Sequence, residues 1–225
     1  MNAPTATPKT LADKVHQALR RDILTGVFAP DSPLRLAALS ARYGMGFSPL
    51  REALNRLEAE RLVTAESLRG FRVAPWSPDA FEDALDTRLL IETDALRLAI
   101  RRNEPGWAEG VRAALAALAG ADGPPDPDIW ELEARHHAFH RALLAGCGSA
   151  WRMAFFERLY HATERYRLPV LMARTGLPRR DIAAEHAALA AAALAGDAEG
   201  AAALLRSHYQ LTAETIRAGS SKKPD

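Results

Sequence analysis

The apolar positions in the first part of the chain recur at helical spacing. They do so over residues 11–25, 34–43 and 50–57, which predicts three short amphipathic helices. Ser48 is a favourable N-cap residue and Pro49 suits the first helical position, so we expect the third helix to begin there.

A change to strand-like spacing follows the third helix. Residues 62–64 and 71–73 are apolar or β-branched and enclose a loop through Arg69 and Gly70, which predicts a short hairpin with a basic tip. Arg51 and Arg56 lie off the apolar stripe of the preceding helix. That helix and its hairpin suit a DNA major groove with a wing beside it, although such a face is more often only solvated.

The remaining chain keeps helical spacing to its end. Ser77-Pro78 repeats the N-cap and N1 pattern and opens a helix to about Asn103, and residues 121–128 form a polar, proline-broken connector. We predict a mainly α protein, with a head of three helices and a hairpin followed by a bundle of about six helices. The other bundle helices are expected over 107–119, 129–145, 150–168, 179–195 and 198–217.

Charge is distributed unevenly along the 225 residues. The formal net charge is +1, but residues 1–76 hold eleven basic and seven acidic side chains, so the first third is positive and the remainder negative. That sign suits a DNA-binding head. We expect a disordered arm over 1–10, a head over 11–76, a bundle over 77–218 and a disordered tail over 219–225.

Cysteine and hydropathy indicate the compartment. Cys147 is the only cysteine, so an intrachain disulfide is excluded and a reducing cytoplasm is the simplest setting. No apolar run approaches the ~18 residues of a membrane span. We therefore expect a cytoplasmic protein without membrane contact.

The head resembles the winged helix-turn-helix of the GntR family of bacterial transcription regulators over roughly residues 11–75. The matching residues are Gly26-Val27-Phe28-Ala29-Pro30, Leu34, Leu39, Tyr43-Gly44, Ser48-Pro49-Leu50-Arg51-Glu52-Ala53-Leu54, Leu57-Glu58, Leu62-Val63 and Arg69-Gly70-Phe71.

The resemblance implies a homodimer bound to double-stranded operator DNA. Gly46 and Phe47 replace the small polar residue and arginine common in the family, so Phe47 is expected against a thymine methyl. Arg51 is expected at a base edge. The DNA-binding residues expected are Arg35, Arg42, Phe47, Ser48, Pro49, Arg51, Arg56, Arg69 and Gly70.

Four histidines in the bundle are candidates for a metal site. His136 and His140 lie four residues apart and project from one helix face, while His186 and His208 lie on later helices. A histidine on an apolar face is usually a packed residue with a hydrogen-bond partner. From spacing alone, packing and metal ligation stay open.

The bundle resembles the FCD effector-binding domain of FadR-like GntR regulators, from Ser77 to about Ile216. The matching runs are residues 139–144, 185–189, 196–197 and 205–208. Many members hold a divalent metal with three histidines and an aspartate, capped by a small organic acid. His140, His186 and His208 match the histidines, and His136 occupies the aspartate position, which favours zinc or nickel or else weakens metal binding.

Arginines supply the expected effector contacts. Arg88 and Glu92 match the family's pair on the first bundle helix, and by resemblance Arg88 binds a ligand carboxylate; the alternative is a surface salt bridge. Arg165 and Tyr166 form a second candidate anion site, with a helix-terminal charge group as the alternative.

These features favour a transcription regulator, of the repressing type, whose operator affinity responds to an organic acid. The rival is a metal-dependent enzyme acting on a small carboxylate, with Glu92, Glu133 or Glu185 as a base. The basic head and the absence of a His-Glu-x-x-His run argue against that rival.

Overall fold

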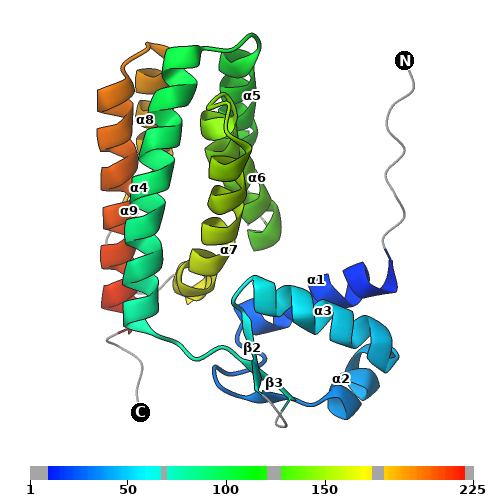
Figure 1. The fold of residues 1–225 in the computed structure, drawn as a ribbon. Coiled ribbons are helices and arrows are strands. Elements are labelled where there is room, and N and C mark those ends of the chain that lie inside the picture. Colours follow the sequence, from blue (N-terminus) through cyan, green and yellow to red (C-terminus); the bar gives the residue numbers. More distant parts are fainter. Residues whose placement is uncertain (1–9, 67–69, 121–127, 174–179, 221–225) are drawn as a thin grey trace, which may run out of the picture. The chain divides into compact units, whose positions relative to one another are not determined.

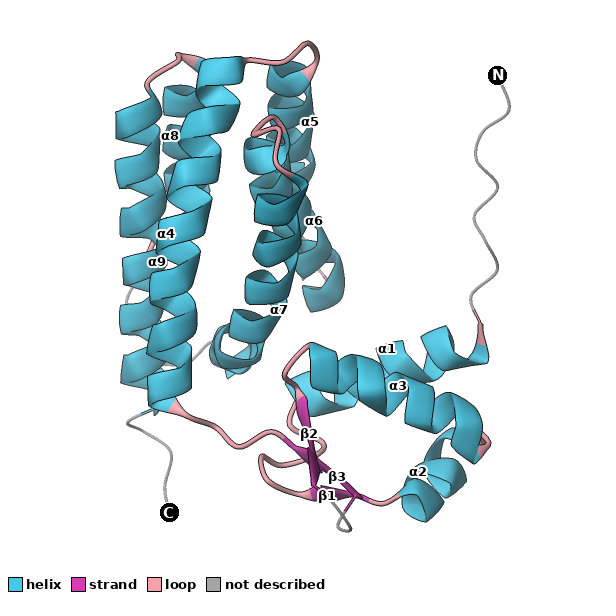
Figure 2. Cartoon of the chain, in the orientation of Figure 1, coloured by secondary structure: helices cyan, strands magenta, loops and turns pink. Residues whose placement is uncertain are grey.

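The computed structural model describes residues 10–66, 70–120, 128–173 and 180–220 and divides the chain into two compact units, one ending at Pro78 and the other starting at Asp79 (Figure 1). The first unit mixes helices and strands, and the second has helices but no strand among its described residues (Figure 2). The predicted winged helix-turn-helix followed by a helical bundle is confirmed.

The first unit holds a helical layer and a small antiparallel sheet of strand order β1-β3-β2. Leu19 of one helix and Leu54 and Leu57 of another are fully buried in its core. Gly44 ends the first helix of the helix-turn-helix at φ 65°, a left-handed conformation that glycine adopts without strain. The elements are α1 (Leu11–Leu24), β1 (Pro33–Leu34), α2 (Leu36–Tyr43), α3 (Phe47–Ala59), β2 (Val63–Glu66) and β3 (Gly70–Val73).

Two details of this unit differ from the sequence prediction. Helix α3 begins at Phe47 with Gly46 as its N-cap, so the assignment of Ser48 as N-cap and Pro49 as N1 is wrong. Pro49 still lies in the first turn, where its missing N–H breaks no intrahelical bond. Leu34, assigned to a helix, instead pairs with Phe71 as strand β1.

The second unit contains six helices among its described residues, as predicted. Helix α7 differs most from the expectation, because it continues through Pro169 to Ala173 instead of ending at Leu168. Leu168 and Tyr166 are buried before the proline, so packing holds this turn in helical form. The helices are α4 (Pro78–Arg102), α5 (Trp107–Ala119), α6 (Ile129–Ala145), α7 (Ala150–Ala173), α8 (Ile182–Leu194) and α9 (Ala198–Ser220).

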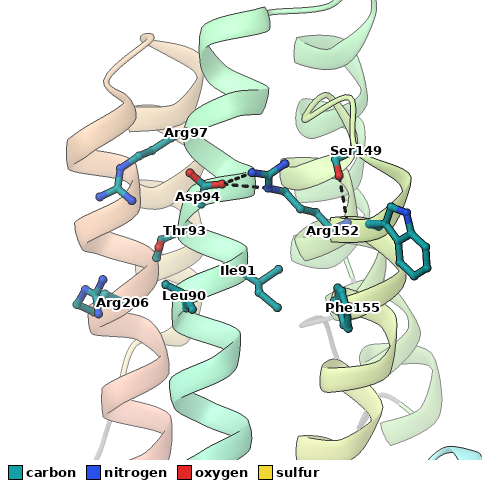
Figure 3. A pocket seen from close by; sticks show the side chains of 10 residues that line it. Leu90, Ile91, Thr93, Asp94, Arg97, Ser149, Arg152, Phe155 and Arg206 are labelled. Atoms are coloured by element: carbon teal, nitrogen blue, oxygen red, sulfur yellow. Dashed lines mark hydrogen bonds and ion pairs between the residues drawn. The ribbon is translucent and has the colours of Figure 1, made fainter.

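An open groove of about 620 Å³ lies along helices α4 and α7 (Figure 3). Its apolar side chains are unusually exposed: Leu90 is 74% exposed, Trp151 77% and Phe155 45%. Arg152 donates to Asp94 across the groove at 2.7 Å. In the described part of the chain, no helix is long and apolar enough to cross a membrane.

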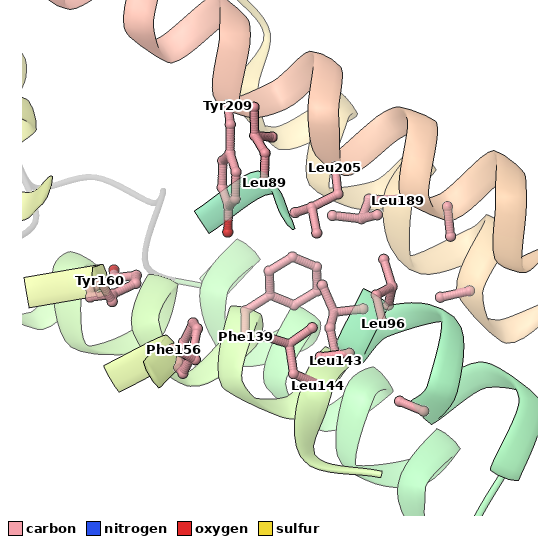
Figure 4. Close-up of a cluster of buried hydrophobic side chains, with 14 of the residues drawn as sticks. Leu89, Leu96, Phe139, Leu143, Leu144, Phe156, Tyr160, Leu189, Leu205 and Tyr209 are labelled. Atoms are coloured by element: carbon pink, nitrogen blue, oxygen red, sulfur yellow. The ribbon is translucent and has the colours of Figure 1, made fainter. Parts of the chain in front are cut away.

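The bundle core is built from leucines, alanines and a few aromatic rings on α4, α6, α7, α8 and α9 (Figure 4). Leu96, Phe139, Leu143 and Leu189 are fully buried. The hydroxyls of two core tyrosines, Tyr160 and Tyr209, need polar partners because an unbonded hydroxyl is costly inside a protein. Their partners form the candidate site.

Candidate metal centre and DNA-binding surface

Four histidines converge inside the bundle. His136 and His140 come from α6, His186 from α8 and His208 from α9. One ligand nitrogen from each lies within 4.8 Å of the others, and Nε2 of His136 is 3.1 Å from Nε2 of His140. The structure thus brings together all four residues that the sequence singled out.

A chain of polar groups supports His136 from its outer side. Its Nδ1 lies 2.8 Å from the Tyr160 hydroxyl, which donates to Glu133 at 2.6 Å. Arg167 donates to both carboxylate oxygens of Glu133, through Nη1 at 2.7 Å and through Nη2.

A second chain supports His140. Its Nδ1 lies 3.2 Å from the Tyr209 hydroxyl, which donates to Glu92. Arg88 donates through Nε to Glu92 at 2.7 Å and through Nη2 to Tyr209 at 2.9 Å. Arg88, Glu92 and Tyr209 are all buried, so this is an internal network and not a surface salt bridge.

His208 is supported directly by a carboxylate. Its Nδ1 lies 2.8 Å from Glu185, and Arg180 donates to both Glu185 and the His208 carbonyl. His186 is different, because its Nε2 is buried and has no hydrogen-bond partner among the described residues. A buried polar atom without a partner is uncommon, and a bound ion or water molecule would satisfy it.

The histidines are held in their neutral forms. Desolvation and the neighbouring imidazoles lower the pKa of His136 and His140 well below its usual range. Burial lowers the pKa of His186 to about 3 and of His208 to about 4, and Glu185 opposes the shift at His208. Neutral imidazole is the form that ligates metal.

The donor set fits a divalent metal ion. Four imidazole nitrogens suit zinc or nickel better than magnesium or calcium, which prefer oxygen ligands. The orphaned Nε2 of His186 is the observation that best supports the fit, since a metal ion would supply its missing partner.

The expected effector residues separate into two places. Arg88 lines a small cavity of about 20 Å³ together with Thr163, Arg167 and Tyr209. That volume holds about one water molecule.

Glu92 lies behind this cavity, fully buried and bonded to Arg88. Arg165 and Tyr166, the other expected pair, are not among the residues that line this cavity. Arg165 packs over the ring of Tyr166, whose own ring is 5.0 Å from that of Phe81.

The expected DNA-binding arginines differ in how they are held. Arg42 pairs with Asp22 at 2.8 Å and Arg56 with Asp13 at 2.7 Å. Arg35 and Arg51 are exposed and make no ion pair or side-chain hydrogen bond within the described residues. They are therefore available to a ligand without first breaking a contact.

The other members of this set lie at the start of α3 and in the wing. Phe47 and Ser48 are exposed in the first turn of α3, and Pro49 beside them is partly buried. Gly70 is exposed at the start of β3, with φ 82°. Arg69 lies outside the described residues.

Sequence reasoning missed the groups that support the histidines. Tyr160, Tyr209 and Arg180 gave no signal, because a lone tyrosine or arginine is ordinary and the histidine that each contacts is 24 to 69 residues away. His137 binds Glu157 at 2.7 Å outside the cluster. His161 Nδ1 lies 3.2 Å from Glu164.

Comparison with known proteins decides the family. Residues 11–73 match the gntR family of bacterial regulatory proteins, and residues 83–211 match the FCD domain. The chain belongs to the GntR family. It is a DNA-binding transcription regulator with a C-terminal FCD domain.

Several relatives resemble this GntR regulator along most of its length. The HTH-type transcriptional repressor GlaR of Escherichia coli (strain K12) is 41% identical, covering 84% of this chain and 88% of its own. The HTH-type transcriptional regulator BphR of Paraburkholderia xenovorans (strain LB400) is 36% identical over 95% of this chain and 88% of its own.

Solved structures share the fold. A GntR family regulator from Pseudomonas syringae pv. tomato superposes with a TM-score of 0.54 at 25% identity, covering 97% of this chain and 90% of its own. McbR/YncC of Escherichia coli reaches a TM-score of 0.73 at 21% identity, with 95% and 98% covered.

The lowered histidine pKa values predict that the metal-free regulator loses stability as the pH falls. Unfolded histidines titrate near 6.5, so between pH 6.5 and about 4 the unfolded chain binds more protons than the folded one. The free energy of unfolding should fall by up to about 1.4 kcal/mol per pH unit for each such histidine. Urea unfolding at pH 7.5, 6 and 5 measures this slope, and His208→Gln should reduce it. An unchanged slope in the variant would contradict the assignment.

Proposed function

We propose that this GntR regulator is a homodimeric repressor whose affinity for operator DNA is modulated by a small organic acid bound in the bundle, at a histidine-ligated metal ion. The relative named as a repressor, 41% identical, supports the direction of regulation. The proposal of an effector and metal site rests mainly on one observation. Four neutral histidines converge, and Nε2 of one of them, His186, is buried without a hydrogen-bond partner among the described residues.

The head supports direct contact with DNA through α3. Arg51 is exposed and makes no ion pair or side-chain hydrogen bond within the described residues, and the same is true of Arg35. A guanidinium in this state can donate two hydrogen bonds to a guanine edge. Arg42 and Arg56, held by aspartates, suit the positioning of the head on phosphates, with Ser48 and the wing beside them.

Operator binding by the full chain tests the proposal. Affinity for the promoter region beside its own gene should exceed that for random DNA, fall steeply with salt and change when the right organic acid is added. Fluorescence anisotropy with labelled duplexes and a panel of acids measures all three. Turnover of an acid without DNA affinity would contradict the proposal.

Arg51→Ala sharpens that experiment. Loss of a base contact should cost about 1–3 kcal/mol at the operator and blur discrimination between sites. Arg112→Ala is the matched control, since Arg112 is an exposed arginine of α5 with only a 3.8 Å contact to Glu109. Equal operator affinity of the two variants would remove Arg51 from the interface.

The metal half of the proposal rests on donor chemistry. His136, His140, His186 and His208 would hold the ion, and a bound ion would supply a Lewis-acid position for a carboxylate oxygen. The protein's own contribution is to orient the rings and to keep them unprotonated. Zinc or nickel is the cofactor that this nitrogen set favours.

Two histidine variants test the metal site. His186→Ala should lower zinc content and affinity at least tenfold, because it removes the ligand without a hydrogen-bond partner. His137→Ala should leave both unchanged, because His137 lies on the same helix as His136 but binds Glu157. Elemental analysis and chelator competition, on protein purified without a nickel column, provide the readout. Equal zinc content in both variants would contradict the site.

The acid would bind beside the cluster. Arg88 and Arg167 both line the adjoining cavity, and both are cations whose planar forks suit a carboxylate. We propose that Glu92, Arg165 and Tyr166, the remaining residues expected to bind the effector, surround the acid without lining this cavity. Because the cavity has room for about one water molecule, entry of an acid requires side chains to move, which gives the ligand a way to favour one conformation.

A second copy of the chain is the proposed occupant of the groove on α4 and α7. One head reads too few base pairs for useful specificity, so two copies are required. The groove is lined by the exposed apolar residues Leu90, Trp151 and Phe155 and by charges of both signs, among them Asp94 and Arg206 (Figure 3). A patch that carries both signs can be complementary to itself across a two-fold axis.

Trp151→Glu tests this interface. The side chain is 77% exposed, so the substitution should leave the fold intact and convert the dimer to monomer. Leu11→Glu is the control, since Leu11 is an exposed apolar residue of the head. Light scattering after size exclusion gives the mass of each, and a dimeric Trp151 variant would contradict the assignment.

A further inference from the structure

Three of the four clustered histidines share one arrangement of hydrogen-bond partners on the side of the imidazole that faces away from the cluster. From the outward Nδ1, a path of polar atoms leads to a glutamate, and each glutamate is paired with an arginine. The three paths are His136–Tyr160–Glu133–Arg167, His140–Tyr209–Glu92–Arg88 and His208–Glu185–Arg180.

The path from His136 determines where its proton lies. The Tyr160 hydroxyl has one hydrogen, and the 2.6 Å contact with Glu133 uses it, because a carboxylate paired with Arg167 can only accept. The hydroxyl oxygen must then accept from His136 Nδ1, 2.8 Å away.

The same reasoning applies to His140. Tyr209 donates its hydrogen to Glu92, and it already accepts from Arg88 at 2.9 Å. The contact from His140 Nδ1 at 3.2 Å is therefore a donation by the ring.

His208 needs no tyrosine, because Glu185 accepts from its Nδ1 at 2.8 Å. Arg180 Nη2 also lies 3.1 Å from that nitrogen, but a guanidinium only donates and has Glu185 and the His208 carbonyl as acceptors. The shorter carboxylate contact places the hydrogen on Nδ1.

We infer that Tyr160 and Glu133 are positioning residues that hold His136 with its hydrogen on Nδ1, so that its Nε2 lone pair faces the centre of the cluster. The inference rests on the proposed metal site for its purpose, but the hydrogen position is a property of the metal-free protein. Tyr209 with Glu92 does the same for His140.

This arrangement gives His136 a carboxylate partner outside the ligand cluster. Glu133 is joined to His136 through the Tyr160 hydroxyl. Two lone pairs then face each other, because Nε2 of His136 and Nε2 of His140 are 3.1 Å apart. Their mutual repulsion favours a cation between them.

Nuclear magnetic resonance of the histidine ring nitrogens tests the inference in the metal-free, full-length protein. In the wild type, His136 should show a protonated Nδ1 and an unprotonated Nε2. In Tyr160→Phe the outward nitrogen loses its acceptor, so the hydrogen should move to Nε2, where His140 can accept it. The His208 signal should not change, since its path ends directly on Glu185.

Zinc affinity gives the second readout, by chelator competition. Tyr160→Phe should lower it about 10–100-fold, the usual effect of removing such a support. Tyr43→Phe is the matched control, because it removes a hydroxyl that also donates to a carboxylate, at 2.7 Å to Asp22 in the head. The control should bind zinc as the wild type does.

The outcomes are decisive in each direction. An unchanged His136 tautomer or unchanged zinc affinity in Tyr160→Phe overturns the inference. If the wild type binds no metal, the proposed site fails, and the tautomer measurement still tests Tyr160. If Tyr160→Phe does not fold, Tyr209→Phe applies the same test to His140.

Discussion

Buried polar groups must be paired, and the bundle of this regulator is organised by that constraint. Imidazole rings and tyrosine hydroxyls from the four helices α6, α7, α8 and α9 meet where leucines and alanines otherwise fill the space. Every outward-facing polar atom of His136, His140 and His208 finds a partner, whereas the buried Nε2 of His186 finds none among the described residues. The missing hydrogen-bond partner thus lies within the histidine cluster. This distinguishes a candidate binding site from a core in which every buried polar atom is hydrogen-bonded.

Arginines near the histidine cluster pair with buried glutamates, and in the proposed function one of them also contacts the acid. Arg88 pairs with Glu92, and Arg167 with Glu133, in places where an isolated charge would be costly. Buried ion pairs of this kind add little net stability, because desolvation offsets their attraction. Their value lies in fixing geometry. In the proposed function, an acid that reaches Arg88 meets a group already bonded to the support of His140, so binding there and at the metal are linked.

The sequence predicted most of the fold because helical spacing, caps and glycine ends are local signals. The bounds of α5 and α6 agree with the expectation, whereas α3, β1 and α7 do not. In α3 the cap moved two residues because Gly46 competes with Ser48 for the same role. In β1, Leu34 adopts a strand conformation because it pairs with Phe71, which is distant in the sequence, so the local pattern could not predict it. In α7, packing overrides the tendency of Pro169 to end a helix.

The candidate site divides in the same way. The four histidines were found from an i,i+4 pair and from family likeness, and the fold brings them together. The tyrosines and arginines behind them depend on contacts between α4, α6, α7 and α9, so spacing along one helix could not reveal them. Arg51 stands out from Arg42 and Arg56 only once their aspartate partners are seen.

X-ray absorption spectroscopy of the zinc-loaded, full-length protein, without added acid, tests the central claim most directly. The account predicts a first shell of four imidazole nitrogens at about 2.0 Å, from His136, His140, His186 and His208. A shell dominated by oxygen, or one with two or fewer imidazoles, would contradict it.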